Sequence, residues 1–167
     1  MFIGELNKKE LEFLETSLNN NKGMSSIEIA SLERRHPYAI MRDDNALIIS
    51  DMTHYGFHDK ELNNFLLSKF GTEDFQLDFF YKLDYKEGNE TTPHKDKYFV
   101  LQTTLILLSD GFSGGNLIVD GKNVNLNKRG MYINFEGNKK THYVTKVESG
   151  VRSVLVVMFN KKSNNLL

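Results

Sequence analysis

The segment Thr92-Pro93-His94-Lys95-Asp96 contains an H-x-D triplet and leads into the strand-rich half of the sequence. In an extended strand, side chains two residues apart point to the same face, so His94 and Asp96 can reach into one cavity while Lys95 points away. One imidazole and one carboxylate suit a divalent iron, manganese or zinc ion. Because such a triplet also arises by chance in many chains, a metal site requires a third ligand.

A candidate third ligand lies far along the chain, in Thr141-His142-Tyr143-Val144, and Arg152 follows His142 after ten positions. Two histidines and one carboxylate leave three coordination positions of a metal open, which is the arrangement of non-haem Fe(II) oxygenases. An arginine that begins an apolar strand is costly to bury without an anion. Arg152 could therefore bind a carboxylate in the same cavity. The alternative is an arginine at the strand end that is solvated or paired with Glu148.

The composition predicts one globular domain without a nucleic-acid partner. The chain has 167 residues, of which 40% are apolar, enough for one compact core and short for two domains. A formal net charge of −1 gives no basic surface of the kind that binds nucleic acid. The chain contains no cysteine, which excludes disulfides, thiolate zinc sites and iron–sulfur clusters. Any metal must therefore be held by His, Asp or Glu.

Targeting signals are not evident in the sequence. The N-terminal stretch MFIGELNKKE lacks a signal-peptide pattern, and no apolar run approaches the length of a membrane span. We therefore expect a soluble, cytoplasmic protein with no membrane partner.

Two helices are predicted in the first half of the chain. Asn7 and Glu10 form a capping-box pattern that predicts a helix from about 8 to 20, with Leu6 and Leu11 at the staple positions on either side of the cap. The apolar face of this helix consists of Leu11, Leu14 and Leu18. A second helix is predicted from about 60 to 70, and its inward face consists of Leu62, Phe65, Leu66 and Phe70.

The region between these helices gives weaker signals. Residues 25–35 fit either a short helix or an irregular strand. Two apolar runs, 38–42 and 46–50, flank Asp43-Asp44-Asn45 and predict a hairpin. His54 and His58 have a spacing that could bind metal on a helix, but Gly56 lies between them, and we predict that both lie in a loop before the second helix.

From Phe75 onward the pattern predicts closely spaced strands. Their ranges are 77–85, 98–109, 116–120, 123–126, 131–135, 142–147 and 151–160. The sequence therefore predicts an α+β, mainly β domain covering 1–167, in which residues 1–74 support a barrel or sandwich formed by residues 75–162. The last strand is apolar on both faces after Arg152 and Ser153, so we expect one face to fill the barrel and the other to contact the helices.

Four blocks between Tyr81 and Lys161 resemble the Fe(II)/2-oxoglutarate-dependent dioxygenases, specifically their prolyl 4-hydroxylase-like branch. Tyr85-x-x-Gly88-x5-His94-x-Asp96 is similar to the Y-x-x-G…H-x-D of that branch, and LILLSDGFSGGNLIV resembles its strand, turn and Gly-Gly hairpin. Arg129-Gly130 through Phe135 resembles the strand before the distal histidine. HYVTKVESGVR resembles the signature H-x-V-x-P-V-x-x-G-x-R.

This resemblance implies a double-stranded β-helix, the jelly-roll or cupin-like barrel. It also implies that His94, Asp96 and His142 are the catalytic iron ligands and that Arg152 binds the C5 carboxylate of 2-oxoglutarate. The implied cofactors are Fe(II), 2-oxoglutarate as co-substrate, O2 and, as an optional reductant, ascorbate. The implied reaction hydroxylates a substrate and releases succinate and CO2.

The chain departs from the family pattern at two positions. Lys146 replaces the proline of the distal signature, which we interpret as loop variation. Leu107 stands where many relatives have a tyrosine that contacts the co-substrate, so another hydroxyl must accompany Arg152. Our first candidate is Tyr85, and Thr103 or Thr104 is the second.

The resemblance makes a prolyl residue of a protein or peptide the expected substrate. The polar segments 86–92 and 138–140 are predicted to form two lips over the metal, which would suit an extended chain. The alternatives are the same cofactor chemistry on a small molecule or a nucleic acid, and a non-catalytic barrel that binds a small anion. The intact triad and arginine favour the enzyme over the silent barrel.

Overall fold

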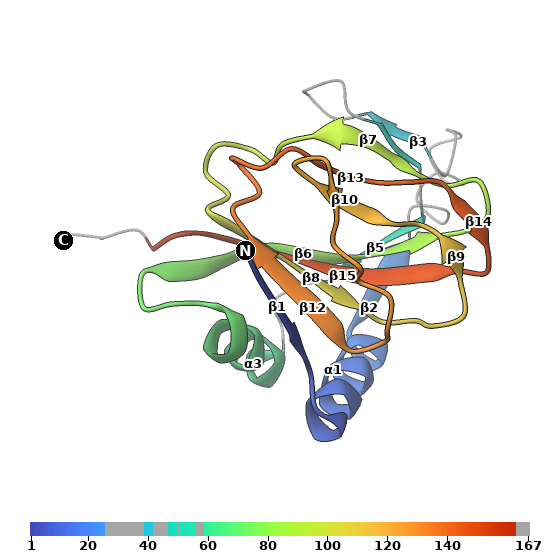
Figure 1. The fold of residues 1–167 in the computed structure, drawn as a ribbon. Coiled ribbons are helices and arrows are strands. Elements are labelled where there is room, and N and C mark those ends of the chain that lie inside the picture. The colour runs from blue at the N-terminus through green and yellow to red at the C-terminus, as the bar shows by residue number, and fades with distance from the viewer. Residues whose placement is uncertain (26–38, 42–46, 50, 56–58, 163–167) are drawn as a thin grey trace.

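The computed structural model describes residues 1–25, 39–41, 47–49, 51–55 and 59–162, and for those of them between residues 22 and 55 it describes only the backbone. Two antiparallel sheets face each other, and two helices cover the outer face of the larger one (Figure 1). In the described part of the chain no helix is long and apolar enough to cross a membrane.

The larger sheet has seven strands in the described residues. Their spatial order is β1 (Phe2–Glu5), β12 (Met131–Phe135), β8 (Gln102–Leu107), β15 (Arg152–Lys161), β6 (Phe75–Tyr85), β5 (Asp51–Tyr55) and β2 (Lys22–Ser25). The facing sheet has the order β11 (Lys122–Asn123), β10 (Leu117–Val119), β13 (His142–Val144), β7 (Thr91–His94), β4 (Leu47–Ile49) and β3 (Ala39–Met41). A separate pair joins β14 (Val147–Ser149) to β9 (Ser113–Gly114). Two facing antiparallel sheets with these connections form the predicted double-stranded β-helix.

Strand β15 separates two apolar cores. Alternate side chains point to opposite faces of a strand. Val154, Val156 and Met158 belong to the core between the sheets, which we call the barrel core. Leu155, Val157 and Phe159 belong to the core beneath the helices, which we call the helix-side core. The prediction that this strand is apolar on both faces because it contacts both layers is confirmed.

Helices α1 (Lys8–Asn20) and α3 (Lys60–Phe70) have the predicted bounds. Asn7 Oδ1 accepts a hydrogen bond of 2.9 Å from the Glu10 amide, and Glu10 Oε1 accepts one of 3.0 Å from the Asn7 amide. This is the capping box predicted from the sequence. The buried side chains of the two helices are Leu11, Leu14, Ser17, Leu18, Leu62, Leu66 and Phe70, and Phe65 packs beside them.

Leu14→Ala is expected to lower the free energy of unfolding by about 2–5 kcal/mol, because it leaves a cavity in the helix-side core. Leu14 is fully buried there. Thr16→Ala changes an exposed position of the same helix and should alter stability by less than about 0.5 kcal/mol. Urea unfolding of both variants tests this. Equal midpoints would show that α1 does not stabilise the barrel.

The first half of the chain also supplies strands to both sheets. β3 and β4 pair with the register Ala39↔Ile49, so the predicted hairpin strands are confirmed, and their turn lies outside the described residues. Residues 26–35 and His58 also lie outside them. His54 is in β5, opposite Tyr81 of β6, so the predicted loop is wrong at that position. Residues 51–55 are part of the sheet because they pair with β6, although their sequence does not show the alternation of apolar and polar residues that predicts a strand.

Two further differences concern strands. The N-terminal residues form β1, which pairs with β12 from Phe2↔Asn134 to Glu5↔Met131, whereas no strand was predicted there. The single strand predicted over 142–147 is two strands, because β13 pairs with β7 and β14 pairs with β9. A short polar stretch therefore divides an otherwise continuous strand pattern between two sheets.

Candidate metal and anion site

Three predicted ligands converge inside the barrel. β13 pairs with β7 so that His142 lies opposite His94, and Asp96 follows two residues after His94. Asp96 Oδ1 is 3.6 Å from His142 Nε2 and 4.0 Å from His94 Nε2. One ligand atom from each residue lies within 4.8 Å of the others, so the three can surround a single ion. β7 ends at His94, so Lys95 and Asp96 follow the strand and are not part of it; Lys95 is exposed and Asp96 is buried.

Backbone carbonyl groups orient both imidazoles. His94 Nδ1 is 2.8 Å from the Thr92 carbonyl oxygen, and His142 Nδ1 is 2.9 Å from the Lys140 carbonyl oxygen. An Nδ1–H that donates to a carbonyl leaves the lone pair on Nε2, which is the tautomer that ligates a metal. Both Nε2 atoms face Asp96 Oδ1, so the tautomers and ring orientations fit a shared metal.

The Asp96 carboxylate is held from the side opposite the imidazoles. Thr103 Oγ1 donates a hydrogen bond of 2.5 Å to Asp96 Oδ2, and the Asp96 amide donates one of 2.9 Å to the Gly137 carbonyl. Thr103 is a candidate contact of the co-substrate, and in the structure its hydroxyl donates to the candidate ligand Asp96 instead.

The triad borders a pocket in the barrel core. The pocket contains about 430 Å³ of space not filled by protein atoms, a volume that includes open solvent at its mouth. Its apolar wall includes Leu105, Leu117, Val144, Val154, Val156 and Met158. Arg152, Tyr85 and Thr91 line the same pocket, so the three candidate ligands and the arginine share one cavity.

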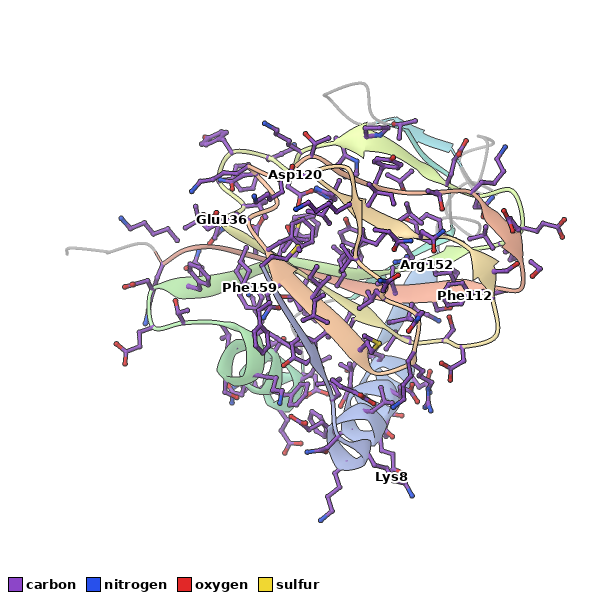
Figure 2. The ribbon with its side chains drawn as sticks, viewed as in Figure 1. Lys8, Phe112, Asp120, Glu136, Arg152 and Phe159 are labelled. Carbon is purple, nitrogen blue, oxygen red and sulfur yellow. The ribbon has the colours of Figure 1, made fainter. Side chains whose placement is uncertain are left out.

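Arg152 is fully buried, and its guanidinium has no hydrogen-bond partner in the described part of the chain. Its Nε, Nη1 and Nη2 atoms are buried without a hydrogen-bond partner, and burial lowers its pKa. Its guanidinium carbon lies 5.4 Å from the centre of the Tyr85 ring. The alternative of a solvated or Glu148-paired arginine is therefore wrong. Figure 2 shows Arg152 between the two sheets, toward the same end of the barrel as Phe112 and away from Glu136.

A glycine makes room for the stem of this arginine. Gly115 has φ +60°, and a Cβ atom there would lie 2.9 Å from Arg152 Cδ and 3.0 Å from Val147 Cγ2. The second glycine of the Gly-Gly hairpin is therefore required both by its backbone conformation and by the close approach of Arg152.

The other predicted hydroxyl contacts are divided between the two faces of the sheet. The Tyr85 hydroxyl is 2.7 Å from Thr91 Oγ1 inside the pocket, and burial raises the Tyr85 pKa. Thr104 Oγ1 instead donates to Asn134 Oδ1 at 2.7 Å and does not line the pocket, so the structure does not support its assignment to the co-substrate. Leu107 is buried in the barrel core. Thr91 was not identified from the sequence, because nothing local indicates its contact with Tyr85.

These residues fit a metal and an anion on physical grounds. Two neutral imidazoles and one carboxylate form the donor set of mononuclear Fe(II) sites with open positions. A buried guanidinium with three unpartnered nitrogens calls for a carboxylate or a similar anion.

The sheets and the enclosed site define the class: this is a double-stranded β-helix protein of the jelly-roll or cupin-like type. No family model and no curated protein matches the sequence. Among solved structures, the fold is shared with a prolyl-4-hydroxylase from Pseudomonas putida, with a TM-score of 0.62 and 14% identity over 97% of this chain and 92% of that chain.

Two further structures share this fold. An oxidoreductase of the 2OG-Fe(II) oxygenase family from Burkholderia pseudomallei matches with a TM-score of 0.54 and 15% identity, over 94% of this chain and 93% of that chain. The viral collagen prolyl hydroxylase of Paramecium Bursaria Chlorella virus-1, in its 2OG complex, matches with a TM-score of 0.56 and 16% identity, over 95% of this chain and 96% of that chain. The fold predicted from the prolyl 4-hydroxylase-like resemblance is confirmed.

Proposed function

We propose that the protein is an Fe(II)- and 2-oxoglutarate-dependent dioxygenase. The observation that carries this proposal is the coexistence in one pocket of a His94–Asp96–His142 cluster and a buried Arg152 that has no hydrogen-bond partner among the described residues. A metal alone would not require the arginine, and an anion alone would not require the triad. A co-substrate that chelates metal at one end and carries a carboxylate at the other uses both.

Each residue has a distinct part in this proposal. His94, Asp96 and His142 hold Fe(II), and Arg152 binds the C5 carboxylate of 2-oxoglutarate through its planar fork. Tyr85 lies beside the guanidinium and adds its hydroxyl to the carboxylate site, with Thr91 fixing the orientation of that hydroxyl. The apolar wall excludes water from the bound groups.

When bound, Fe(II), 2-oxoglutarate and O2 supply the oxidising chemistry, which releases succinate and CO2 and places a hydroxyl group on the substrate; ascorbate would serve as an accessory reductant. The protein supplies the geometry, the dry cavity and the fixed charge. Arg152 begins β15, whereas Met158, farther along that strand, pairs with Thr103, the hydrogen-bond partner of Asp96. In this proposal the co-substrate therefore spans from the triad to Arg152 and is held by both of its ends.

The substrate that we propose is a prolyl residue of a protein or peptide. Large apolar side chains are exposed around the metal end of the barrel. Phe79 is 39% exposed, and its ring stacks on the ring of the pocket residue Tyr81 with 5.5 Å between the ring centres. Met158 of β15 lies between Phe79 on one neighbouring strand and Thr103 on the other, so Phe79 lies at the level of the metal cluster. Tyr98 and Phe99 follow Asp96 closely in sequence and are 86% and 37% exposed. Such a rim suits a peptide better than a small polar metabolite.

The predicted pair of lips is only half supported. The Asn138 side chain donates to the Tyr98 carbonyl, so residues 138–140 lie beside the exposed rim. The 86–92 segment begins at the opposite end, because the Gly88 amide donates to the Val147 carbonyl and Tyr85 pairs with Arg152. The lip prediction is therefore wrong for the turn at 86–89. This turn follows the end of β6 that pairs with Arg152, whereas the metal cluster lies toward the other end of that strand.

The test is to incubate the Fe(II)-loaded protein with 2-oxoglutarate, O2 and proline-containing peptides, and to locate any added oxygen by fragmentation mass spectrometry. We expect one oxygen on a prolyl residue and an equivalent amount of succinate. Reproducible oxygen on a free amino acid, a nucleobase or a non-prolyl side chain, with prolines untouched, would refute the prolyl assignment alone. Binding of 2-oxoglutarate with no substrate modified across a whole lysate would support the silent anion-binding barrel.

A further inference from the structure

We infer that Thr103 is a positioning residue that makes Asp96 a one-oxygen metal ligand. This inference rests on the proposed metal site. It assigns to Thr103 a role through Asp96, in place of the contact with the co-substrate that the sequence suggested. Thr103 is 1% exposed and lies on β8, on the face that lines the barrel.

The two oxygens of Asp96 have different surroundings. Oδ1 faces the two imidazole Nε2 atoms, at 3.6 Å and 4.0 Å. Oδ2 accepts a hydrogen bond from the Thr103 hydroxyl at 2.5 Å, the short end of the range for a hydroxyl that donates to an ionised carboxylate. A hydroxyl proton that points at Oδ2 competes with a metal for that oxygen. Asp96 therefore presents Oδ1 to the metal.

The backbone at Gly137 closes the remaining space around Oδ2. A Cβ atom at this glycine would lie 2.0 Å from Asp96 Oδ2 and 2.2 Å from Thr103 Oγ1. The Gly137 carbonyl also accepts the Asp96 amide, at 2.9 Å. The carboxylate is therefore held at its backbone and at Oδ2, and Oδ2 occupies the space that a side chain at residue 137 would fill.

This arrangement has a consequence for coordination number. A carboxylate bound through both oxygens would occupy two positions of a six-coordinate metal, whereas one oxygen occupies one position. With two imidazoles and a single Asp96 oxygen, three positions stay open, the number needed by a bidentate 2-oxo acid and O2 together. The Thr103 hydroxyl thus preserves an open position as well as orienting a ligand.

The neighbouring Thr104 provides a matched control. It is the same residue type, is fully buried, and also donates its hydroxyl to a side-chain oxygen, Asn134 Oδ1 at 2.7 Å. Its side chain points to the other face of β8, away from the pocket. A change at Thr104 therefore reports the general cost of losing a buried threonine hydroxyl from this strand.

The experiment is calorimetric titration of the metal-free full chain with Mn(II), which needs no turnover. Removing an outer hydrogen bond to a metal ligand costs about 10- to 100-fold in metal affinity. We expect that loss for Thr103→Val and Thr103→Ala, near-parental affinity for Thr103→Ser, and parental affinity for Thr104→Val. The Co(II) absorption spectrum should change in the Val and Ala variants and stay parental in the Ser and Thr104→Val variants.

Three outcomes would separate the possibilities. Parental Mn(II) affinity and an unchanged Co(II) spectrum in Thr103→Ala and Thr103→Val would overturn the inference while the metal site stands. A Ser variant as weak as the Ala variant would also overturn it, because methyl packing rather than the hydroxyl would then matter. Failure of the parent chain itself to bind Mn(II) would instead refute the proposed function. If Thr103→Val does not fold, the comparison of Ala with Ser decides the question.

Discussion

His142→Ala is expected to abolish turnover and to weaken metal binding to the point where no stoichiometric complex forms. Each of His94, Asp96 and His142 supplies one of only three protein ligands, and the two imidazoles are already oriented by backbone carbonyls. No other His, Asp or Glu of the described residues forms a cluster with them that could substitute. His94→Ala and Asp96→Ala should behave in the same way. Titration of the metal-free variants with Mn(II), and succinate release after Fe(II) loading, measure the two effects.

Glu87→Ala is a suitable control, because it removes a carboxylate from an exposed turn that is remote from the triad. Its metal affinity and turnover should equal those of the parent. The triad is wrongly assigned if any two of the three single variants bind metal and turn over like the parent. A loss of metal binding in all three with folded circular dichroism spectra, and none in Glu87→Ala, would support it.

Local sequence signals predicted the elements that depend on local interactions. Helix α1 could be predicted because its signals act within one or two helical turns. These signals are the Asn7–Glu10 capping box and the repeat of Leu11, Leu14 and Leu18. The two-faced apolar pattern of β15 predicted a strand between a barrel core and a helix layer, as observed. The grouping of His94, Asp96 and His142 was predicted from the H-x-D triplet and from family blocks in the right order, and the structure brings the three residues together.

Features that depend on contacts between distant segments could not be predicted in this way. Thr103 and Asp96 are seven residues apart in sequence. Their hydrogen bond depends on the path of the segment between Asp96 and the start of β8, which local sequence signals do not predict. Gly137 is one glycine among many in the sequence. Only the fold shows that Asp96 occupies the space that a side chain at this position would need. The sequence predicts a loop at His54 because its neighbours are polar and lack strand periodicity. The strand forms there through pairing with β6, which is distant in sequence.

Arg152→Leu is expected to spare metal binding and to weaken 2-oxoglutarate binding severely. Truncating one partner of a buried, hydrogen-bonded charge pair costs about 2–5 kcal/mol, which corresponds to roughly a 30- to 3,000-fold rise in the dissociation constant. The full burial of Arg152 places it in this range, because water cannot replace the lost partner. Calorimetric titration of the Mn(II)-loaded protein with 2-oxoglutarate gives the dissociation constant without turnover. Leucine removes the buried charge, so the variant should remain folded.

Arg152→Lys should be intermediate, because an ammonium keeps the charge but cannot bind both carboxylate oxygens in the planar geometry of a guanidinium. Arg129→Leu removes a surface arginine that pairs with Glu15 and should leave the 2-oxoglutarate affinity unchanged. The order parent, Lys, Leu in affinity would indicate that both the charge and the fork of Arg152 contact the co-substrate. Unchanged affinity in the Leu variant would place the co-substrate elsewhere and leave the buried guanidinium without a role in it. A Leu variant that lost metal as well as 2-oxoglutarate would contradict the separation of the two binding functions between the triad and Arg152.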